Sequence, residues 1–265
     1  MDPGSLGAWV ALPALGLCVG LLVGATGVGA GSLTTPALVL GFGVPPLVAV
    51  GTDLLFASAT KMAGAVVHHK LGAVDTRVLR GLAIGSLPAA VLTLGVLWLA
   101  AIDKSMLASL IRTALGVVLM LTVCALLLRP LIGSRHSGTR DGADAPATQM
   151  PRLAVIGALL GVLVALTSIG AGALGVVALA VAVPAMTAQR IVGTDIAHAI
   201  PLTLVCGMGH LAMGHLDVHL LGSLLVGSVP GVWLGARLGV RLPDGVLRTL
   251  LAAVLLVAAV MLLAG

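Results

Sequence analysis

Two aspartates, Asp53 and Asp195, stand within long apolar stretches, and each directly follows a Gly-Thr pair. A carboxylate inside a membrane-spanning helix is costly and by default has a function. His198 follows Asp195 by three residues and therefore lies on the same helical face, where a carboxylate and an imidazole can relay protons near neutral pH. We expect Asp53, Asp195 and His198 to be proton-coupling residues. The alternative for each aspartate is a position near a helix end, at the membrane interface.

Two glycine-rich breaks interrupt the apolar sequence, at residues 26–32 and 168–173. Irregular backbone at membrane depth is tolerated only where it is buried in protein or lines a cavity. The helix that follows such a break would offer free N–H groups and the positive end of its dipole to an anion. Gly27 lies in the first break, and we expect substrate-binding residues in and directly after the breaks: Gly29, Gly31, Ser32, Gly170 and Gly172. The alternative is close helix packing through small residues.

The two halves of the chain carry these features at a constant distance. Asp53 and Asp195 are 195 − 53 = 142 residues apart. The same offset relates four further pairs: His68 with His210, Asp75 with Asp217, Gly85 with Gly227, and Pro88 with Pro230. Because Asp, His and Pro are rare in this sequence, their coincidence indicates an internal duplication rather than shared low complexity.

Lys61 lies near the middle of an apolar stretch, too deep for its ammonium group to reach the membrane surface easily. It follows Asp53 by two helical turns and lies on nearly the same face. The ammonium group would either contact an anionic substrate or form a structural ion pair with Asp53, and both hypotheses stay open. The corresponding residue of the second half is Thr203, so the halves are not equivalent at this position.

The composition nearly excludes a soluble protein. Hydrophobic residues make up 59% of the chain and charged residues 9%, and the mean hydropathy is +1.20. A soluble globular chain carries about 25% charged residues. The net charge is +5, but the basic residues lie between apolar runs, which favours a role in membrane orientation over nucleic-acid binding. No metal-ligand spacing is present, and we expect neither a metal site nor a cofactor.

We predict an all-α polytopic membrane protein with about five apolar segments in each half. The first membrane repeat, 1–128, and the second, 153–265, are separated by a polar linker, 129–152, which we expect to be cytoplasmic. The expected segments are 8–24, 32–42, 47–69, 78–100 and 105–128, then 153–168, 173–183, 189–213, 219–239 and 246–264. The second segment of each half is too short to cross ~30 Å of hydrocarbon at 1.5 Å per residue. Each half is therefore expected to begin with a helix hairpin folded around its glycine break.

Basic residues set the expected orientation, because cytoplasmic loops hold the excess of Lys and Arg. In the first half they follow the third segment, as Lys70, Arg77 and Arg80. In the second half the cluster that includes Arg237 and Arg248 follows the fourth segment. Placing all of them inside requires the halves to have opposite orientations, with both termini outside. The sequence therefore predicts an inverted repeat, an architecture common among secondary transporters.

The sequence also resembles a known family. The glycine break, the following Pro36, and the stretch Ala49-Val50-Gly51-Thr52, repeated at Ile191–Thr194, are similar to motifs of the TauE/SafE sulfite exporter family of membrane permeases. This resemblance covers nearly the whole chain. It implies transport of a small anion, often sulfur-containing, such as sulfite or an organosulfonate. It also marks Thr52 and Thr194, beside the glycines, as motif-matched positions for substrate binding.

Two departures from the family pattern stand out. Ala30 and Ala171 occupy the middle of breaks that often contain three consecutive glycines, and Asp53 and Asp195 occupy positions that often hold serine. A carboxylate at that position would either disfavour an anion or carry the coupling proton.

The function expected from the sequence is that of a multi-pass inner-membrane permease, not an enzyme, that moves a small anion by alternating access. Its partners would be that anion and the lipid bilayer, with a homo-oligomer as one option. Two alternatives stay open. One is a cation or metal carrier that uses Asp53 and Asp195. The other is an intramembrane enzyme built on Ser32, although no catalytic motif accompanies that serine.

Overall fold

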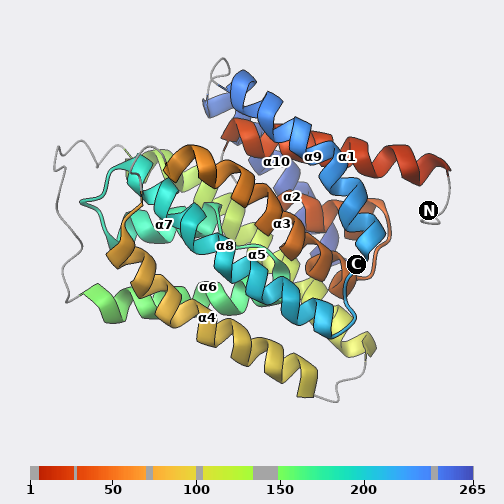
Figure 1. The fold of residues 1–265 in the computed structure, drawn as a ribbon, viewed down its shortest axis with the longest axis horizontal. Helices are drawn as coiled ribbons and strands as arrows, with labels where there is room; N and C mark the ends of the chain where they lie inside the picture. Colours follow the sequence, from red (N-terminus) through yellow and green to blue (C-terminus); the bar gives the residue numbers. More distant parts are fainter. Residues whose placement is uncertain are drawn as a thin grey trace.

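The computed structural model describes residues 6–26, 29–69, 74–99, 104–133, 149–239 and 244–264, and all its regular elements there are helical (Figure 1). The first half contains α1 (Leu6–Thr26), α2 (Gly31–Pro36), η1 (Ala37–Gly41), α3 (Pro46–His69), α4 (Thr76–Leu99) and α5 (Lys104–Gly133). The second half contains α6 (Met150–Thr167), α7 (Ala173–Ala182), α8 (Ala188–Ala212), α9 (Val218–Gly239) and α10 (Asp244–Ala264).

The predicted all-helical membrane fold is confirmed. Five described helices, within α4, α5, α6, α8 and α9, are long and apolar enough to cross a membrane. Large apolar side chains such as Leu92 and Val226 are exposed on the outer helices, as expected for contact with lipid. The second predicted segment corresponds to α2 and its π-helical continuation η1. Helices α5 and α6 extend into the predicted linker from its two ends, and residues 134–148, like Gly27, lie outside the described residues.

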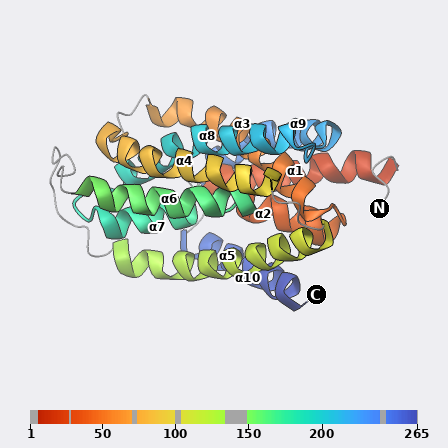
Figure 2. The same ribbon diagram turned by 90° about the horizontal axis from the view of Figure 1, so that it is seen from below.

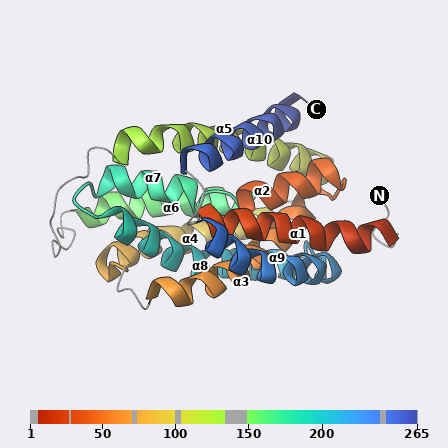
Figure 3. The same cartoon turned by 90° about the horizontal axis from the view of Figure 1, so that it is seen from above.

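Each half begins with a helix hairpin. Helix α1 and the α2–η1 segment run in opposite directions, and so do α6 and α7 (Figures 2 and 3). The tips of the two hairpins meet in the middle of the bundle, where Gly31 touches the carbonyl group of Ser168. A β-carbon added at Gly29 would lie 2.5 Å from the carbonyl oxygen of Ala171. The two glycine breaks, far apart in the sequence, therefore pack directly against each other.

Glycines pack the first helix of each half against the fourth helix of the other half. A β-carbon added at Gly20 of α1 would lie 2.9 Å from Cα of Ser228 in α9. A β-carbon added at Gly161 of α6 would lie 2.9 Å from Cα of Ser86 in α4. Four-residue spacing of such glycines places them on one face and allows backbones to approach closely. The same contact therefore occurs twice, with the halves exchanged.

Helices α3 and α8 pack against each other and run in opposite directions. Near the start of α3, a β-carbon on Gly51 would lie 2.9 Å from Cβ of His210, near the end of α8. One turn further along α3, Leu55 packs on Gly207. Helices α5 and α10 lie together on another side of the bundle (Figure 2).

Helices α4 and α9 begin in the same way. The side chain of Asp75 accepts hydrogen bonds from the N–H groups of Arg77 (3.0 Å) and Val78 (3.1 Å), and Asp217 accepts one from Leu220 (3.0 Å). Aspartate favours helix starts because its carboxylate satisfies N–H groups that have no partner within the helix. These paired caps fix where the two long helices enter the bundle.

Arginines gather at one end of the bundle. They lie in the first two turns of α4, α6, α8 and α10 and in the last turn of α9, namely Arg77, Arg80, Arg152, Arg190, Arg248 and Arg237. These helix ends lie on the same side in Figure 1, whereas α1 begins and α10 ends on the opposite side. The tendency of basic residues to remain in the cytoplasm favours that arginine-rich end as the inner one.

The glycine contacts predict opposite effects for two substitutions in α9. Gly227→Ala would drive a methyl group into the carbonyl oxygen of Pro13 in α1, whereas a β-carbon at Gly222 meets nothing within 4 Å. We expect Gly227→Ala to lower the free energy of unfolding by about 1–3 kcal/mol, the usual cost of overpacking. Gly222→Ala should be neutral or stabilise by up to about 1 kcal/mol, since alanine favours helix. Thermal unfolding in detergent would measure both, and equal midpoints would contradict the packing.

Candidate functional site

The second glycine break has a backbone that ordinary side chains disfavour. Helix α6 ends at Thr167, and Ser168 caps it with φ 59°, donating its N–H to Val164 O at 2.9 Å. Gly170 and Gly172 follow with φ 133° and 137°. Glycine adopts such angles without a steric penalty, so these two residues let the chain turn directly into α7.

The first break uses its glycines differently. Gly29 and Gly31 do not have positive φ angles, and α2 already begins at Gly31. Instead, the missing side chains admit the carbonyl groups of Ala171 and Ser168 from the other hairpin. Glycine thus shapes the backbone in one half and allows close contact in the other.

Lys61 extends from α3 to the junction of the breaks. Its ammonium group donates a hydrogen bond to the carbonyl oxygen of Ala171 at 2.8 Å, and the residue is only 8% exposed. A β-carbon on Gly29 would lie 3.6 Å from Lys61 Nζ. The structure therefore brings Lys61 together with both glycine breaks, and the ammonium group is close enough to Asp53 and Asp195 for electrostatic attraction.

The two aspartates face the short helices of their own hairpins. Asp53 is fully buried, and its Oδ2 accepts a hydrogen bond from Thr35 Oγ1 of α2 at 2.7 Å. Its Oδ1 has no hydrogen-bond partner among the described residues. Asp195 is 1% exposed and lies against Gly175 in the first turn of α7. Both carboxylates therefore lie inside the protein beside the hairpins.

His198 and Asp195 contact different helices: His198 contacts α4, whereas Asp195 contacts α7. Its Nε2 lies 2.7 Å from Ser86 Oγ of α4, the serine that also packs on α6. Its buried Nδ1 has no hydrogen-bond partner within the described part of the chain. The imidazole thus connects α8 to α4, and a proton relay between Asp195 and His198 stays a prediction.

Thr52 and Thr194 contact the caps of the long helices. Thr52 Oγ1 accepts a hydrogen bond from the N–H of Asp217 at 3.1 Å, and Thr194 Oγ1 accepts one from the N–H of Asp75 at 2.9 Å. These contacts are equivalent under the 142-residue offset. They show how each threonine positions the start of a helix from the other half, and the predicted role in substrate binding stays a prediction.

A small cavity of about 10 Å³ lies between the breaks. Its walls are Gly29, Ser32, Thr122, Ser168, Ile169, Gly170, Ala171, Ala173 and Leu174. A cavity of this size holds about one water molecule. The hydroxyl group of Ser32 donates to Gly29 O at 3.1 Å, whereas Ser168 Oγ is buried with no partner among the residues that the structure describes. The junction is therefore closed, and it is lined by hydroxyl groups and backbone.

Several contacts were not anticipated from the sequence. Thr35 and Thr122 join the site only because separate helices meet there, whereas Ser168 belongs to the predicted second break but was not among its expected binding residues. Arg190 at the start of α8 forms an ion pair of 3.1 Å with Asp75, which is almost fully buried. The residue that corresponds to Arg190 in the first half is Val48, so the internal duplication does not predict this ion pair.

Comparison with known proteins identifies the family. Residues 12–262 match the family model described as Sulfite exporter TauE/SafE. The chain belongs to the TauE/SafE family. It is 36% identical over 254 residues to the probable membrane transporter protein YjnA of Bacillus subtilis (strain 168), covering 96% of this chain and 99% of that protein. It is also 26% identical over 231 residues to the probable membrane transporter protein YdhB of the same strain, covering 87% and 90%.

Membership of the TauE/SafE family confirms the resemblance seen in the sequence. With its apolar helices, it makes this chain a multi-pass membrane transporter. No solved structure matches the chain at a significant level.

The backbone of the second break predicts that Gly170 is needed for its conformation rather than for space. A β-carbon there would meet its nearest neighbour at 3.3 Å, but φ is 133°. We expect Gly170→Ala to lower the free energy of unfolding by about 1–3 kcal/mol, because strained backbone has this cost. Ser168→Gly serves as the control: it relieves a left-handed serine and should not destabilise the protein. A lower unfolding midpoint for Ser168→Gly than for Gly170→Ala would contradict this backbone assignment.

Proposed function

We propose that this protein is a carrier that moves a small, sulfur-containing anion, such as sulfite or an organosulfonate, by alternating access coupled to protons. The observation that carries the proposal is the position of Lys61. Its buried ammonium group lies at the junction of the two glycine breaks, bonded to Ala171 O. A cation held at membrane depth beside flexible backbone is suited to an anion that enters and leaves.

In this proposal the anion replaces part of the hydrogen bonding inside the junction. Lys61 supplies positive charge, and the hydroxyl groups of Ser32, Thr122 and Ser168 supply donors around the cavity. Gly29, Gly31, Gly170 and Gly172 leave room for the anion. Thr52 and Thr194 act by positioning the helix starts that they contact. The cavity holds about one water molecule, so the hairpins must separate before an anion enters.

Charge balance gives a reason for proton coupling. One ammonium group and two ionised carboxylates, Asp53 and Asp195, would leave the site negative and would repel an anion. Two like charges 4 Å apart repel by about 4 kcal/mol at the dielectric typical of a protein surface. Protonation of a carboxylate removes that repulsion. A bound proton therefore raises the affinity for the anion, and a bound anion raises the affinity for the proton. His198, one turn from Asp195, would exchange protons with the two aspartates.

The paired contacts support an inverted repeat and alternating access. The packing of α1 on α9 repeats that of α6 on α4, and α3 runs opposite to α8. This pattern is expected of two halves related by an axis in the membrane plane. The ion pair between Asp75 and Arg190 lies at the arginine-rich end. In the first half the position equivalent to Arg190 holds Val48, so this ion pair has no counterpart at the opposite end. We propose that breaking this pair accompanies opening toward the cytoplasm.

A cation carrier has less support. No group of three His, Cys, Asp or Glu side chains suited to a metal ion occurs in the described ranges. Lys61 also lies within electrostatic range of both aspartates, where it would oppose a bound cation. Flux of divalent metal in place of the anion would nevertheless favour that alternative.

Lys61→Met should reduce anion flux at least about 100-fold, because binding loses its charge-assisted partner. The measurement is uptake of radiolabelled sulfite into proteoliposomes, with and without an imposed pH gradient. Lys104→Met at the start of α5 is a control that removes the same charge elsewhere. Full flux by folded Lys61→Met would remove Lys61 from the site. Absence of sulfite flux in the wild type would move the search to organosulfonates.

Asp53→Asn and Asp195→Asn should each weaken the dependence of flux on the pH gradient, since the amide cannot take up a proton. Flux driven by the anion gradient alone should persist in at least one of them. Asp217→Asn is a matched control, because asparagine caps a helix as well as aspartate. Unchanged pH dependence in both variants would assign proton coupling to other residues.

A further inference from the structure

His210 is a fully buried histidine in the last turn of α8. Its Nε2 lies 2.9 Å from the carbonyl oxygen of Ala165 in α6. A carbonyl oxygen only accepts hydrogen bonds, so Nε2 carries the proton and the imidazole is the donor. A side chain of α8 therefore holds the backbone of the helix that leads into the second glycine break.

The accepting carbonyl group belongs to the last turn of α6. In a continuing helix, Ala165 O would accept from the N–H of Ile169, four residues further on. Helix α6 ends at Thr167, and the N–H of Ile169 donates to Thr167 Oγ1 instead, at 3.1 Å. Carbonyl groups at a helix end need partners from outside the helix, and histidine side chains can supply them. His210 thus satisfies a carbonyl group that lies three residues before Ser168.

His210 also packs against the start of α3, the helix that carries the first aspartate. A β-carbon on Gly51 would lie 2.9 Å from His210 Cβ and would collide with the carbonyl group of His215. The N–H of His215 donates to His210 O at 2.9 Å, and the two ring centroids lie 5.9 Å apart. Gly51 precedes Asp53 by two residues, so the end of α8 and the turn after it pack on the backbone that presents this carboxylate.

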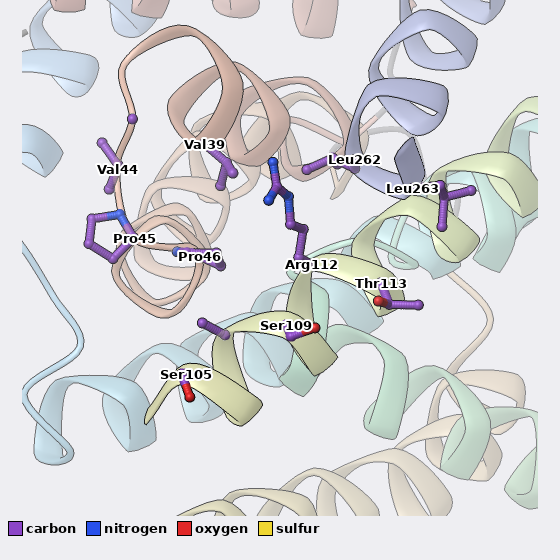
Figure 4. Close-up of a pocket in the computed structure, with 12 residues that line it drawn as sticks. Val39, Val44, Pro45, Pro46, Ser105, Ser109, Arg112, Thr113, Leu262 and Leu263 are labelled. Carbon is purple, nitrogen blue, oxygen red and sulfur yellow. The ribbon is translucent and has the colours of Figure 1, made fainter. Parts of the chain in front are cut away.

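Another face of the α3 start is less tightly packed. Pro45 and Pro46 border a cavity of about 620 Å³ that lies between η1, α5 and α10 (Figure 4). Figure 4 shows Val39 of η1 and Leu262 of α10 around the same space. Pro46 precedes Gly51 by five residues, or about 140° around the helix, so the cavity and the two histidines lie on different faces of α3. Contacts on the side of α8 therefore position this end of α3 more firmly than contacts on the side of the cavity.

We propose that His210 is a positioning residue for the anion site. It connects the end of α8 to Ala165 on one side and to Gly51 on the other, and so holds the second glycine break in a fixed position relative to Asp53. The proposal rests on the proposed anion transport, because the arrangement that His210 maintains is the junction that Lys61 reaches. His210 acts through the backbone of the break rather than by touching the anion, and an ordered break lowers the cost of binding.

Hydrogen–deuterium exchange of the purified protein, before any sulfite is added, tests this positioning. His210→Leu removes the donor and keeps a buried side chain of similar size. Amide exchange in residues 165–175 should become about tenfold faster, the effect of leaving one buried carbonyl group without its hydrogen bond. His210→Gln should restore slow exchange, because its amide N–H lies at nearly the position of Nε2. His210→Asn is too short to reach Ala165 O, so it should resemble His210→Leu and replaces that variant if it does not fold.

Gly227→Ala is the control for a general loss of stability, because it strains a different contact, that of α1 with α9. Exchange in this control should rise without preference for residues 165–175. Equally uniform acceleration in His210→Leu would overturn the positioning role. Unchanged exchange in folded His210→Leu or His210→Asn, or fast exchange in His210→Gln, would overturn it as well.

Sulfite binding, measured by calorimetric titration, separates this inference from the proposed function. His210→Leu should bind sulfite about tenfold more weakly than the wild type, and His210→Gln should bind it normally. Normal affinity in His210→Leu, despite faster exchange at the break, would overturn the role of His210 in the site. Wild-type protein that binds no sulfite would contradict the proposed function, and the exchange result would still decide whether His210 positions the break.

Discussion

The hydrogen bond from Lys61 to Ala171 O connects the two halves of this transporter at their centre. A buried ammonium group is tolerated only if hydrogen bonds and opposite charges replace its hydration. The carbonyl oxygen of the second glycine break supplies the hydrogen bond, and Asp53 and Asp195 supply the charge. The hairpin tips can approach this closely only because glycines stand at the contact points. The site, the breaks and helices α3 and α8 therefore depend on one another.

Several helix contacts repeat under the duplication, whereas Lys61 of the proposed site has no counterpart of its own type. Thr52 with Asp217 and Thr194 with Asp75 are equivalent contacts, as are the glycine contacts of α1 with α9 and of α6 with α4. Lys61 corresponds to Thr203, whose hydroxyl group bonds to its own helix at Ala199 O. His198 and Arg190 also lack an equivalent of the same type.

Much of the fold could be predicted from the sequence because the bilayer restricts the choices. Apolar runs of fixed length specify helices, and glycine breaks beside short segments specify hairpins. The contacts of the first helix of each half with the fourth helix of the other could not be predicted, since any glycine-lined face suits several partners. Sequence spacing selected Asp53 and Lys61 as site residues but left their partners open. Thr35 and Thr122 are ordinary residues in apolar surroundings, and only the folded structure brings their hydroxyl groups to the site.

The proposed linkage between anion and proton at Lys61 is tested most directly by isothermal titration calorimetry of the purified protein with sulfite near neutral pH. Titration in buffers with different ionisation enthalpies gives the number of protons taken up for each anion bound, after correction for the protonation of sulfite itself. The expected result is saturable binding with uptake of about one proton per anion, reduced in Asp53→Asn or Asp195→Asn and with binding abolished in Lys61→Met. Binding that persists in Lys61→Met, or that releases protons, would contradict the proposed site.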